Sequence, residues 1–267
     1  MIFALLLATA AQAAAPAEPA ALVPTGKWRV EYADTMCILS HEYDTGAGKV
    51  TLALRPLPMS TETQVALFTP GTGAIVPEGK AEIALSPGGP PTSGTYQRFT
   101  PPNQPVRVAT MYFAGTALDG LEKATAISLR LGKDAYRLAV PGISGGMEVL
   151  ASCQADLLKG WGIEMHERST LSRPASGNPG RFFDSHAYPA AAVSAHEQGR
   201  VVAVASIAVT GRVEKCTIVA TSKSPSLDAA TCAILRTQGR FSPALDLAGH
   251  PVASHLIVPV RWVLPES

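Results

Sequence analysis

"GRVVAVASIAVTGRVEKCTIVATS", residues Gly199 to Ser222, has the pattern of a β-hairpin. Its first segment, Val201 to Val209, is almost continuously apolar, which is typical of a strand that is covered on both faces. Thr210 and Gly211 follow, and glycine can adopt the positive φ that a tight turn requires. We therefore predict two antiparallel strands, the first of which lies in the middle of a sheet.

The residues on either side of this hairpin predict two helices and one further strand. Residues 187–198 predict a short helix, and residues 226–241 predict a second one with Ser226 as its N-cap. Residues 251–264 alternate apolar side chains in the manner of a strand. Pro259 interrupts this strand, and proline cannot donate a hydrogen bond to a neighbouring strand. We therefore expect the last strand at an edge of the sheet.

The first half of the chain, residues 24–163, is predicted to be a β-rich domain. It contains many short strand-like segments separated by turns such as SPGGPPTSG and TPPNQP, a pattern typical of a sandwich or a barrel-like domain. A helix over residues 145–162 closes it. The apolar stripe of that helix comprises Val149, Leu150, Cys153, Leu157 and Leu158.

Composition divides the chain and excludes one class of partner. Residues 164–184 are rich in Ser, Pro, Gly and Asn in their middle, as in a linker, so we expect residues 185–267 to form a separate α+β domain. The apolar fraction of 46% is enough for a sizeable core in each domain. The formal net charge is only +1, which argues against a nucleic-acid partner.

The first residues indicate export. Ile2 to Leu7 form a short apolar region, and Ala11 to Ala13 fit a small-residue cleavage pattern. We predict that residues 1–13 are a signal peptide, that the mature protein is periplasmic, and that it has no stable membrane span. The absence of Lys and Arg before the apolar region leaves an uncleaved anchor as the alternative.

The four cysteines are expected to form disulfides in an exported protein. Four cysteines allow three pairings, and none of them has the C-x-x-C spacing of redox or zinc motifs. The division into two domains favours Cys37–Cys153 in the first domain and Cys216–Cys232 in the second. A link between Cys153 and Cys216 would contradict the proposed domain boundary.

The second half strongly resembles the C-terminal domain of TonB-type energy transducers, over about Tyr188 to Leu264. Short motifs carry the resemblance through their order along the chain. They comprise Tyr188-Pro189 and Ala192, then Gly199, Val201 and Val204, then Gly211, Val213 and Val219, then Leu227, Asp228 and Ala230, then Arg240 to Ala244, Gly249 to Val252 and Pro259 to Trp262.

The resemblance implies a three-stranded antiparallel sheet backed by two helices. In this family the domain binds the Ton box, a short extended peptide of TonB-dependent outer-membrane receptors, which adds as a strand beside the last strand. Strand addition requires an exposed edge, which Pro259 predicts independently. The peptide-binding residues implied here are Tyr188, Pro189, Ala253, Ser254, His255, Leu256 and Ile257.

The chain also departs from a full transducer, which has an uncleaved membrane helix and a long proline-rich spacer. A β-rich domain stands where that spacer would be. Binding of receptor peptides therefore carries over better than force transmission, although assistance to energy-dependent transport is part of the hypothesis. The alternative is an envelope scaffold in which the same edge pairs with another protein or with a second copy of this chain.

Catalytic and metal motifs are weak. Gly142 to Gly146 fit the G-x-S-x-G pattern of a hydrolase nucleophile, with Ser144 at its centre. The surrounding short strands lack the parallel crossover scaffold that this motif needs, so a glycine turn before a helix is the favoured interpretation. The histidines show no metal-binding spacing and no phosphate-binding glycine motif occurs. We expect a protein that is not an enzyme and binds no cofactor or metal.

Overall fold

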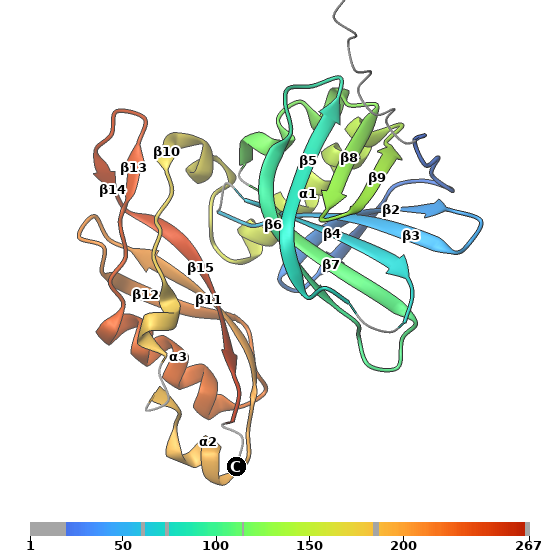
Figure 1. The fold of residues 1–267 in the computed structure, drawn as a ribbon. Helices are drawn as coiled ribbons and strands as arrows, with labels where there is room; N and C mark the ends of the chain where they lie inside the picture. The colour runs from blue at the N-terminus through green and yellow to red at the C-terminus, as the bar shows by residue number, and fades with distance from the viewer. Residues whose placement is uncertain (1–19, 60–61, 73–74, 114, 184–186, 265–267) are drawn as a thin grey trace, which may run out of the picture.

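The computed structural model describes residues 20–59, 62–72, 75–113, 115–183 and 187–264, which form two domains (Figure 1). The first is built around a large antiparallel sheet, and the second around a smaller sheet with helices on one side. The predicted signal peptide, residues 1–13, lies outside the described residues.

The first domain has one curled sheet whose order, among the described residues, is β1-β2-β3-β4-β7-β6-β5-β8-β9. Its strands are β1 (Arg29–Ala33), β2 (Met36–Asp44), β3 (Lys49–Pro56), β4 (Thr63–Pro70), β5 (Glu78–Ser86), β6 (Thr92–Phe99), β7 (Val106–Phe113), β8 (Ala126–Leu131) and β9 (Asp134–Ala139). Two short 3-10 helices, η1 (Gly115–Leu118) and η2 (Leu121–Lys123), connect β7 to β8.

The sheet closes on itself through the segment that precedes β1. Leu22 bridges Leu138 of β9, and Pro24 bridges Tyr43 of β2. The Tyr43 hydroxyl donates to the carbonyl oxygen of Ala139 at 3.0 Å and strengthens the closure. Of the two predicted architectures, the sandwich and the barrel-like domain, the structure therefore has the closed, barrel-like one. Alternate side chains of its strands fill a single apolar core.

Helix α1 (Ile143–Gly160) covers one side of this core. Leu150, Cys153 and Leu158 are buried as predicted, whereas Val149 is 48% exposed and does not belong to the apolar stripe. Cys153 forms the predicted disulfide with Cys37 of β2. The bond joins the start of the domain to its end, 116 residues later.

The second domain contains the sheet β12-β11-β15 in the described part of the chain. The elements of this domain are α2 (Ala190–Ser194), β11 (Gly199–Ile207), β12 (Val213–Ala220), α3 (Pro225–Gln238), β13 (Ala244–Asp246), β14 (Pro251–Val252) and β15 (Ser254–Trp262). The apolar strand β11 is central and β15 lies at an edge, so both predictions from the sequence are confirmed. The predicted disulfide Cys216–Cys232 joins β12 to α3.

The start of α3 differs from its prediction. Ser224, not Ser226, is the N-cap, and its hydroxyl accepts a hydrogen bond from the Leu227 N–H at 3.2 Å. Pro225 occupies the first helical position, where its fixed φ fits and its missing N–H costs nothing. The predicted cap, Ser226, follows this proline and lies inside the helix.

Residues 164–183 of the predicted linker are folded onto the second domain, and residue 184 lies outside the described residues. The folded segment contains η3 (Met165–Thr170), β10 (Leu171–Arg173) and η4 (Pro179–Phe182). β10 pairs with β13 in the small sheet β10-β13-β14, and further along the chain the N–H groups of Ser176 and Ser242 each donate to the other's carbonyl oxygen. Phe182 then contacts Phe241 edge-on. These residues consequently form one wall of the C-terminal domain.

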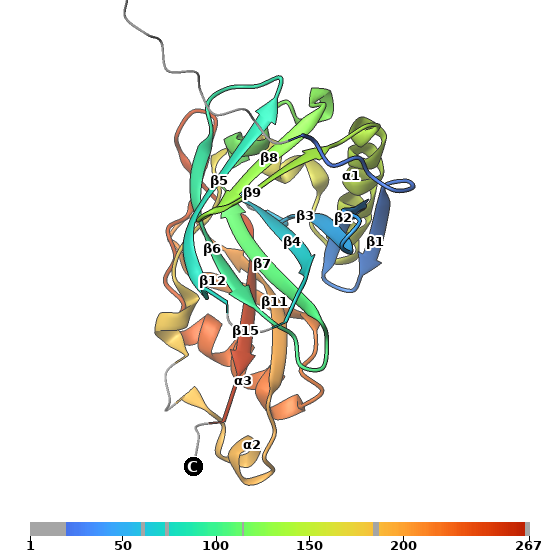
Figure 2. The same cartoon turned by 45° about the vertical axis from the view of Figure 1, so that its right-hand side comes forward.

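The two domains share an apolar contact, which we call the interdomain cluster. It contains Met59, Leu158, Ile163 and Val204, with Trp161, Val219 and Ile257 packed against it. Val204 and Ile257 lie on the open face of the β12-β11-β15 sheet, and α3 covers the other face (Figure 1). The turned view in Figure 2 shows the same stacking of the first domain on the small sheet. No helix in the described ranges is long and apolar enough to span a membrane.

Candidate functional site

The outer edge of β15 is the most distinctive surface of the second domain. β15 pairs with β11 over its whole length, from Ser254 opposite Ile207 to Trp262 opposite Gly199, without a register shift. Among the described residues no strand pairs with its other side. Unpaired backbone groups along a strand edge can bind another extended chain.

The alternation of an antiparallel pair identifies the groups that face outward. The His255 N–H is directed away from β11, because it donates to the Glu167 carboxylate at 2.7 Å. Every second residue has the same orientation, so Ile257, Pro259 and Arg261 also direct their backbone groups outward. Pro259 therefore lacks an N–H at a position that no β11 group needs, which explains how a proline fits in this strand.

Glu167 covers the beginning of this edge. Its second carboxylate oxygen lies 2.7 Å from Nδ1 of His255, so the side chain contacts both the backbone and the imidazole of one residue. Burial raises the pKa of the Glu167 carboxyl, but the two hydrogen bonds from His255 and the nearby histidine charges outweigh it and lower the pKa overall. Glu167 therefore stays ionised to lower pH than an ordinary glutamate.

Replacing Glu167 with alanine is expected to expose the His255 N–H. Amide hydrogen exchange at His255 should become at least about tenfold faster, because the donor loses its acceptor at an open edge. The measurement is hydrogen exchange followed by NMR at neutral pH. Val258, which faces β11, is the internal reference. Unchanged exchange at His255 would show that Glu167 does not protect this edge.

A hollow of about 430 Å³ lies against the outer edge of β15. Leu256 and Ile257 both line it although their side chains point to opposite faces of the sheet, so the hollow extends around the free edge. Its walls come from the linker, β11, β15 and the first domain. The lining comprises Thr35, Arg55, Leu57, Pro58, Met59, Glu62, Pro174, Ala175, Ser176, Gly177, Arg200, Val202, Leu256, Ile257 and Pro259.

Two arginines from different domains line this hollow. Nη1 of Arg55 donates to the Gln64 side chain at 3.2 Å, and Gln64 in turn donates to the Tyr112 hydroxyl at 2.7 Å. Burial, and then the nearby charge of Arg200, lower the pKa of the Arg55 guanidinium. Nε of Arg55 is buried and has no hydrogen-bond partner among the described residues. Arg55 thus brings a cationic group to the wall of the hollow, while its Nε is shielded from solvent.

The structure places the other predicted site residues at the two ends of β15. Ala253 is exposed just before the strand, and Ser254 is buried. Tyr188 lies near the far end, where its ring contacts Trp262 edge-on and its hydroxyl donates to the Glu197 carbonyl oxygen at 2.6 Å. Pro189 is the N-cap of α2. The side chain of Tyr188 is thus packed, with its hydroxyl already engaged.

The region around Ser144 has no catalytic arrangement in the described part of the chain. Ser144 lies in the first turn of α1, and β9 before it belongs to an antiparallel sheet rather than to the parallel scaffold of a nucleophile elbow. No hydrogen bond joins Ser144 to any described histidine or carboxylate. Within the described ranges, no cluster of three or more His, Cys, Asp or Glu side chains could hold a metal ion.

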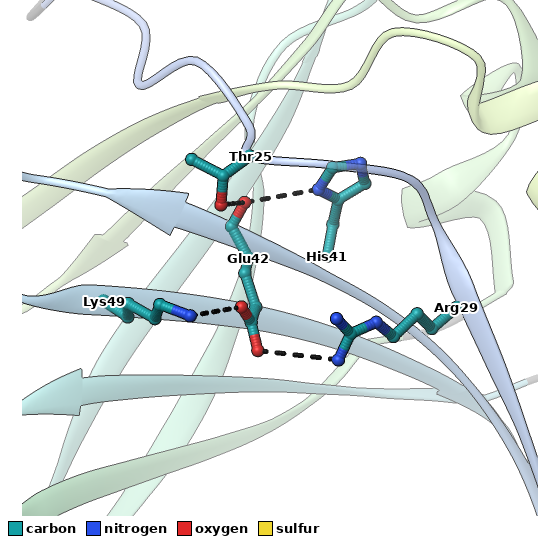
Figure 3. Close-up of polar contacts among 5 residues, drawn as sticks. All are labelled: Thr25, Arg29, His41, Glu42 and Lys49. Carbon is teal, nitrogen blue, oxygen red and sulfur yellow. Dashed lines mark hydrogen bonds and ion pairs between the residues drawn. The ribbon is translucent and has the colours of Figure 1, made fainter.

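A polar cluster on β2 of the first domain consists of ion pairs and a packed histidine, which stabilise the fold (Figure 3). Glu42 pairs with Lys49 at 3.0 Å and with Arg29 at 3.8 Å, and the hydrogen bond from Lys49 lowers its pKa. The neighbouring His41 is only 3% exposed and contacts the Trp28 ring edge-on. Burial lowers the pKa of the His41 imidazole, so it is held neutral inside the domain.

His41 is expected to make the first domain less stable in mild acid. Its pKa is lower in the folded state than the ordinary 6.5, so below about pH 6.5 the unfolded chain binds the proton more strongly. The contribution of neutral His41 to the free energy of unfolding is fully present above this pH, and it is lost as the pH drops toward the folded-state pKa. Urea unfolding at pH 7.5 and 5.5 measures the loss, which His41→Phe should reduce. An equal loss in both proteins would contradict this assignment.

The comparison with known families places the second domain. Residues 184–264 match the family described as Gram-negative bacterial TonB protein C-terminal. The match confirms the resemblance inferred from the sequence, and it includes α2, α3 and all three strands of the β12-β11-β15 sheet. A domain of this family indicates a location in the bacterial envelope. No curated protein and no solved structure matches the chain.

Proposed function

We propose that the TonB-type C-terminal domain of this chain binds Ton-box peptides of outer-membrane TonB-dependent receptors in the periplasm. The peptide adds as a strand to the outer edge of β15. The observation that carries this proposal is the unpaired edge itself, which opens onto a hollow large enough to admit side chains. β12 is the other edge of the same sheet, but the residues lining this hollow include none from β12.

Backbone groups supply most of the binding. The outward-facing carbonyl oxygens of His255, Ile257, Pro259 and Arg261 would accept hydrogen bonds from the peptide, and the N–H groups of Ile257 and Arg261 would donate to it. Pro259 supplies no donor, and Glu167 occupies the one at His255. The edge therefore offers a short, interrupted pattern, which limits indiscriminate pairing with other strands.

The protein assists receptor-dependent transport as a binding component and catalyses no reaction in this proposal. The folding of residues 164–183 onto the C-terminal domain supports this role, because it keeps the first domain beside the binding edge. An envelope scaffold that pairs β15 edges between two copies is the competing function. It uses the same surface and differs only in the occupant.

Titration of the full mature chain with fluorescently labelled Ton-box peptides tests the proposal. Ordering a flexible peptide costs entropy, so we expect a dissociation constant on the order of 10 µM for Ton-box sequences. Scrambled peptides of the same composition should bind at least about tenfold more weakly. Equal binding of both sets would contradict the proposal, and concentration-dependent dimerisation without peptide binding would favour the scaffold.

A further inference from the structure

The first domain contributes a fixed wall beside the binding edge. Its β3–β4 hairpin reaches the open face of the small sheet, where Met59 is 5% exposed and belongs to the interdomain cluster. The side chain of Ile257 packs against the same cluster, while its backbone groups face away from β11 along the outer edge. The hairpin therefore lies next to the strand edge that the proposed function assigns to the peptide.

Strand geometry predicts which peptide side chains would meet this wall. Residues directly opposite each other in neighbouring strands direct their side chains to the same face of the sheet. The side chains of Ile257 and Pro259 lie on the open face, together with that of Arg200 on β11. A peptide residue opposite Ile257 or Pro259 would consequently point its side chain toward the first domain.

The charges at this position favour one anionic group. Arg55 and Arg200 line the hollow together, and they lie close enough that the charge of Arg200 adds to burial in lowering the pKa of Arg55. A carboxylate between two guanidinium groups relieves their repulsion and accepts hydrogen bonds from both. Glu62 also lines the hollow, so the wall carries two positive charges and one negative charge. This balance suits a single acidic side chain better than an acidic run.

We propose that the first domain completes the peptide site, with Arg55 and Arg200 binding an aspartate or glutamate side chain of the peptide opposite Ile257 or Pro259. This inference rests on the proposed function and adds to it a preference for one acidic peptide side chain, to which both domains contribute an arginine. Arg55 belongs to the first domain, outside the residues that match the family. Recognition of the acid is therefore a property of the two domains together.

Nine-residue synthetic peptides test this selectivity on the full chain. Each alternates threonine and valine and carries one aspartate, which is moved along the peptide, and a matched set carries asparagine. The best aspartate peptide should bind roughly tenfold more tightly than its asparagine partner, as expected for a charge-assisted hydrogen bond. Arg55→Gln and Arg200→Gln should each reduce this ratio to below about threefold. Arg130→Gln, which changes an exposed arginine paired with Glu82, should leave the ratio unchanged.

The outcomes separate this inference from the proposed function. Peptides that bind equally well with aspartate and asparagine would overturn the inference and leave strand addition intact. A preference for aspartate that survives both arginine substitutions would also overturn it. If neither these peptides nor Ton-box peptides bind, the proposed function fails as well. Thermal unfolding of each variant shows whether it has folded. Arg200→Gln is the variant expected to disturb folding less, because Arg200 is exposed.

Discussion

Replacing Cys37 and Cys153 with alanine is expected to lower the free energy of unfolding of the first domain by about 4.7 kcal/mol. The disulfide joins residues 116 apart, so the unfolded chain loses much conformational entropy when the bond is present. Both cysteines are 2% exposed and belong to the core, and alanine avoids placing an unpaired hydroxyl there. This loss is of the same order as the whole stability of many domains.

The second disulfide provides the matched comparison. Cys216 and Cys232 are only 16 residues apart, so their replacement by alanine should cost the second domain about 3 kcal/mol. Urea titrations followed by the indole NMR signals distinguish the domains, because Trp28 packs in the first and Trp262 in the second. A larger loss from the short loop than from the long one would contradict the entropic explanation.

Ile257→Pro is expected to weaken Ton-box binding by at least about tenfold. The substitution removes the N–H at the middle of the outer edge, where the peptide would otherwise accept a hydrogen bond. It leaves the ladder with β11 intact, because the backbone groups of Ile257 face away from β11. Pro259, two residues later with the same orientation, shows that this strand accommodates proline at an outward-facing position.

Ile257→Ala is the control for the lost side chain. Ile257 packs against the interdomain cluster, so both variants remove that contact, but only proline removes the N–H. Peptide titration and circular dichroism of both variants separate binding from folding. If alanine weakens binding as much as proline does, the side chain rather than the strand edge supports the peptide. If neither variant weakens it, the peptide binds elsewhere.

Local patterns predicted much of the second domain. The apolar run at Val201 to Val209 placed β11 at the centre of its sheet, and Pro259 placed β15 at an edge. Both inferences depend on backbone pairing and burial, which leave a direct trace in the order of residue types. The two disulfides followed from the division into domains, because each pair lies within one of them.

The composite nature of the hollow could not be predicted in this way. Arg55 and Arg200 meet only because the β3–β4 hairpin packs on the open face of the small sheet, and no sequence period relates them. β10 is equally inconspicuous, since its three residues are too few to show an alternation and pair with a strand far along the chain. Composition therefore indicated a linker, whereas in the structure this segment contains β10 and pairs with β13 of the C-terminal domain.

The role of Glu167 could not be predicted either, because its segment has no local pattern and its contact is distant in sequence. Its sequence neighbours place it in a predicted linker, yet its carboxylate lies at the beginning of β15, 88 residues later in the chain. A single acidic residue in a polar segment gives no local signal of such a contact. Its position restricts the edge that a peptide can use, so the predicted contact region from Ala253 to Ile257 is partly occupied at His255.

Strand addition at the outer edge of β15 is tested most directly by amide hydrogen exchange of the isotope-labelled full chain, with and without a Ton-box peptide at saturating concentration. The Ile257 and Arg261 amides should become at least about tenfold more protected, because they acquire acceptors from the added strand. Amides of β12, at the opposite edge of the sheet, should not change. Protection that appears along β12 instead, or binding that leaves the Ile257 and Arg261 amides unchanged, would contradict strand addition at β15.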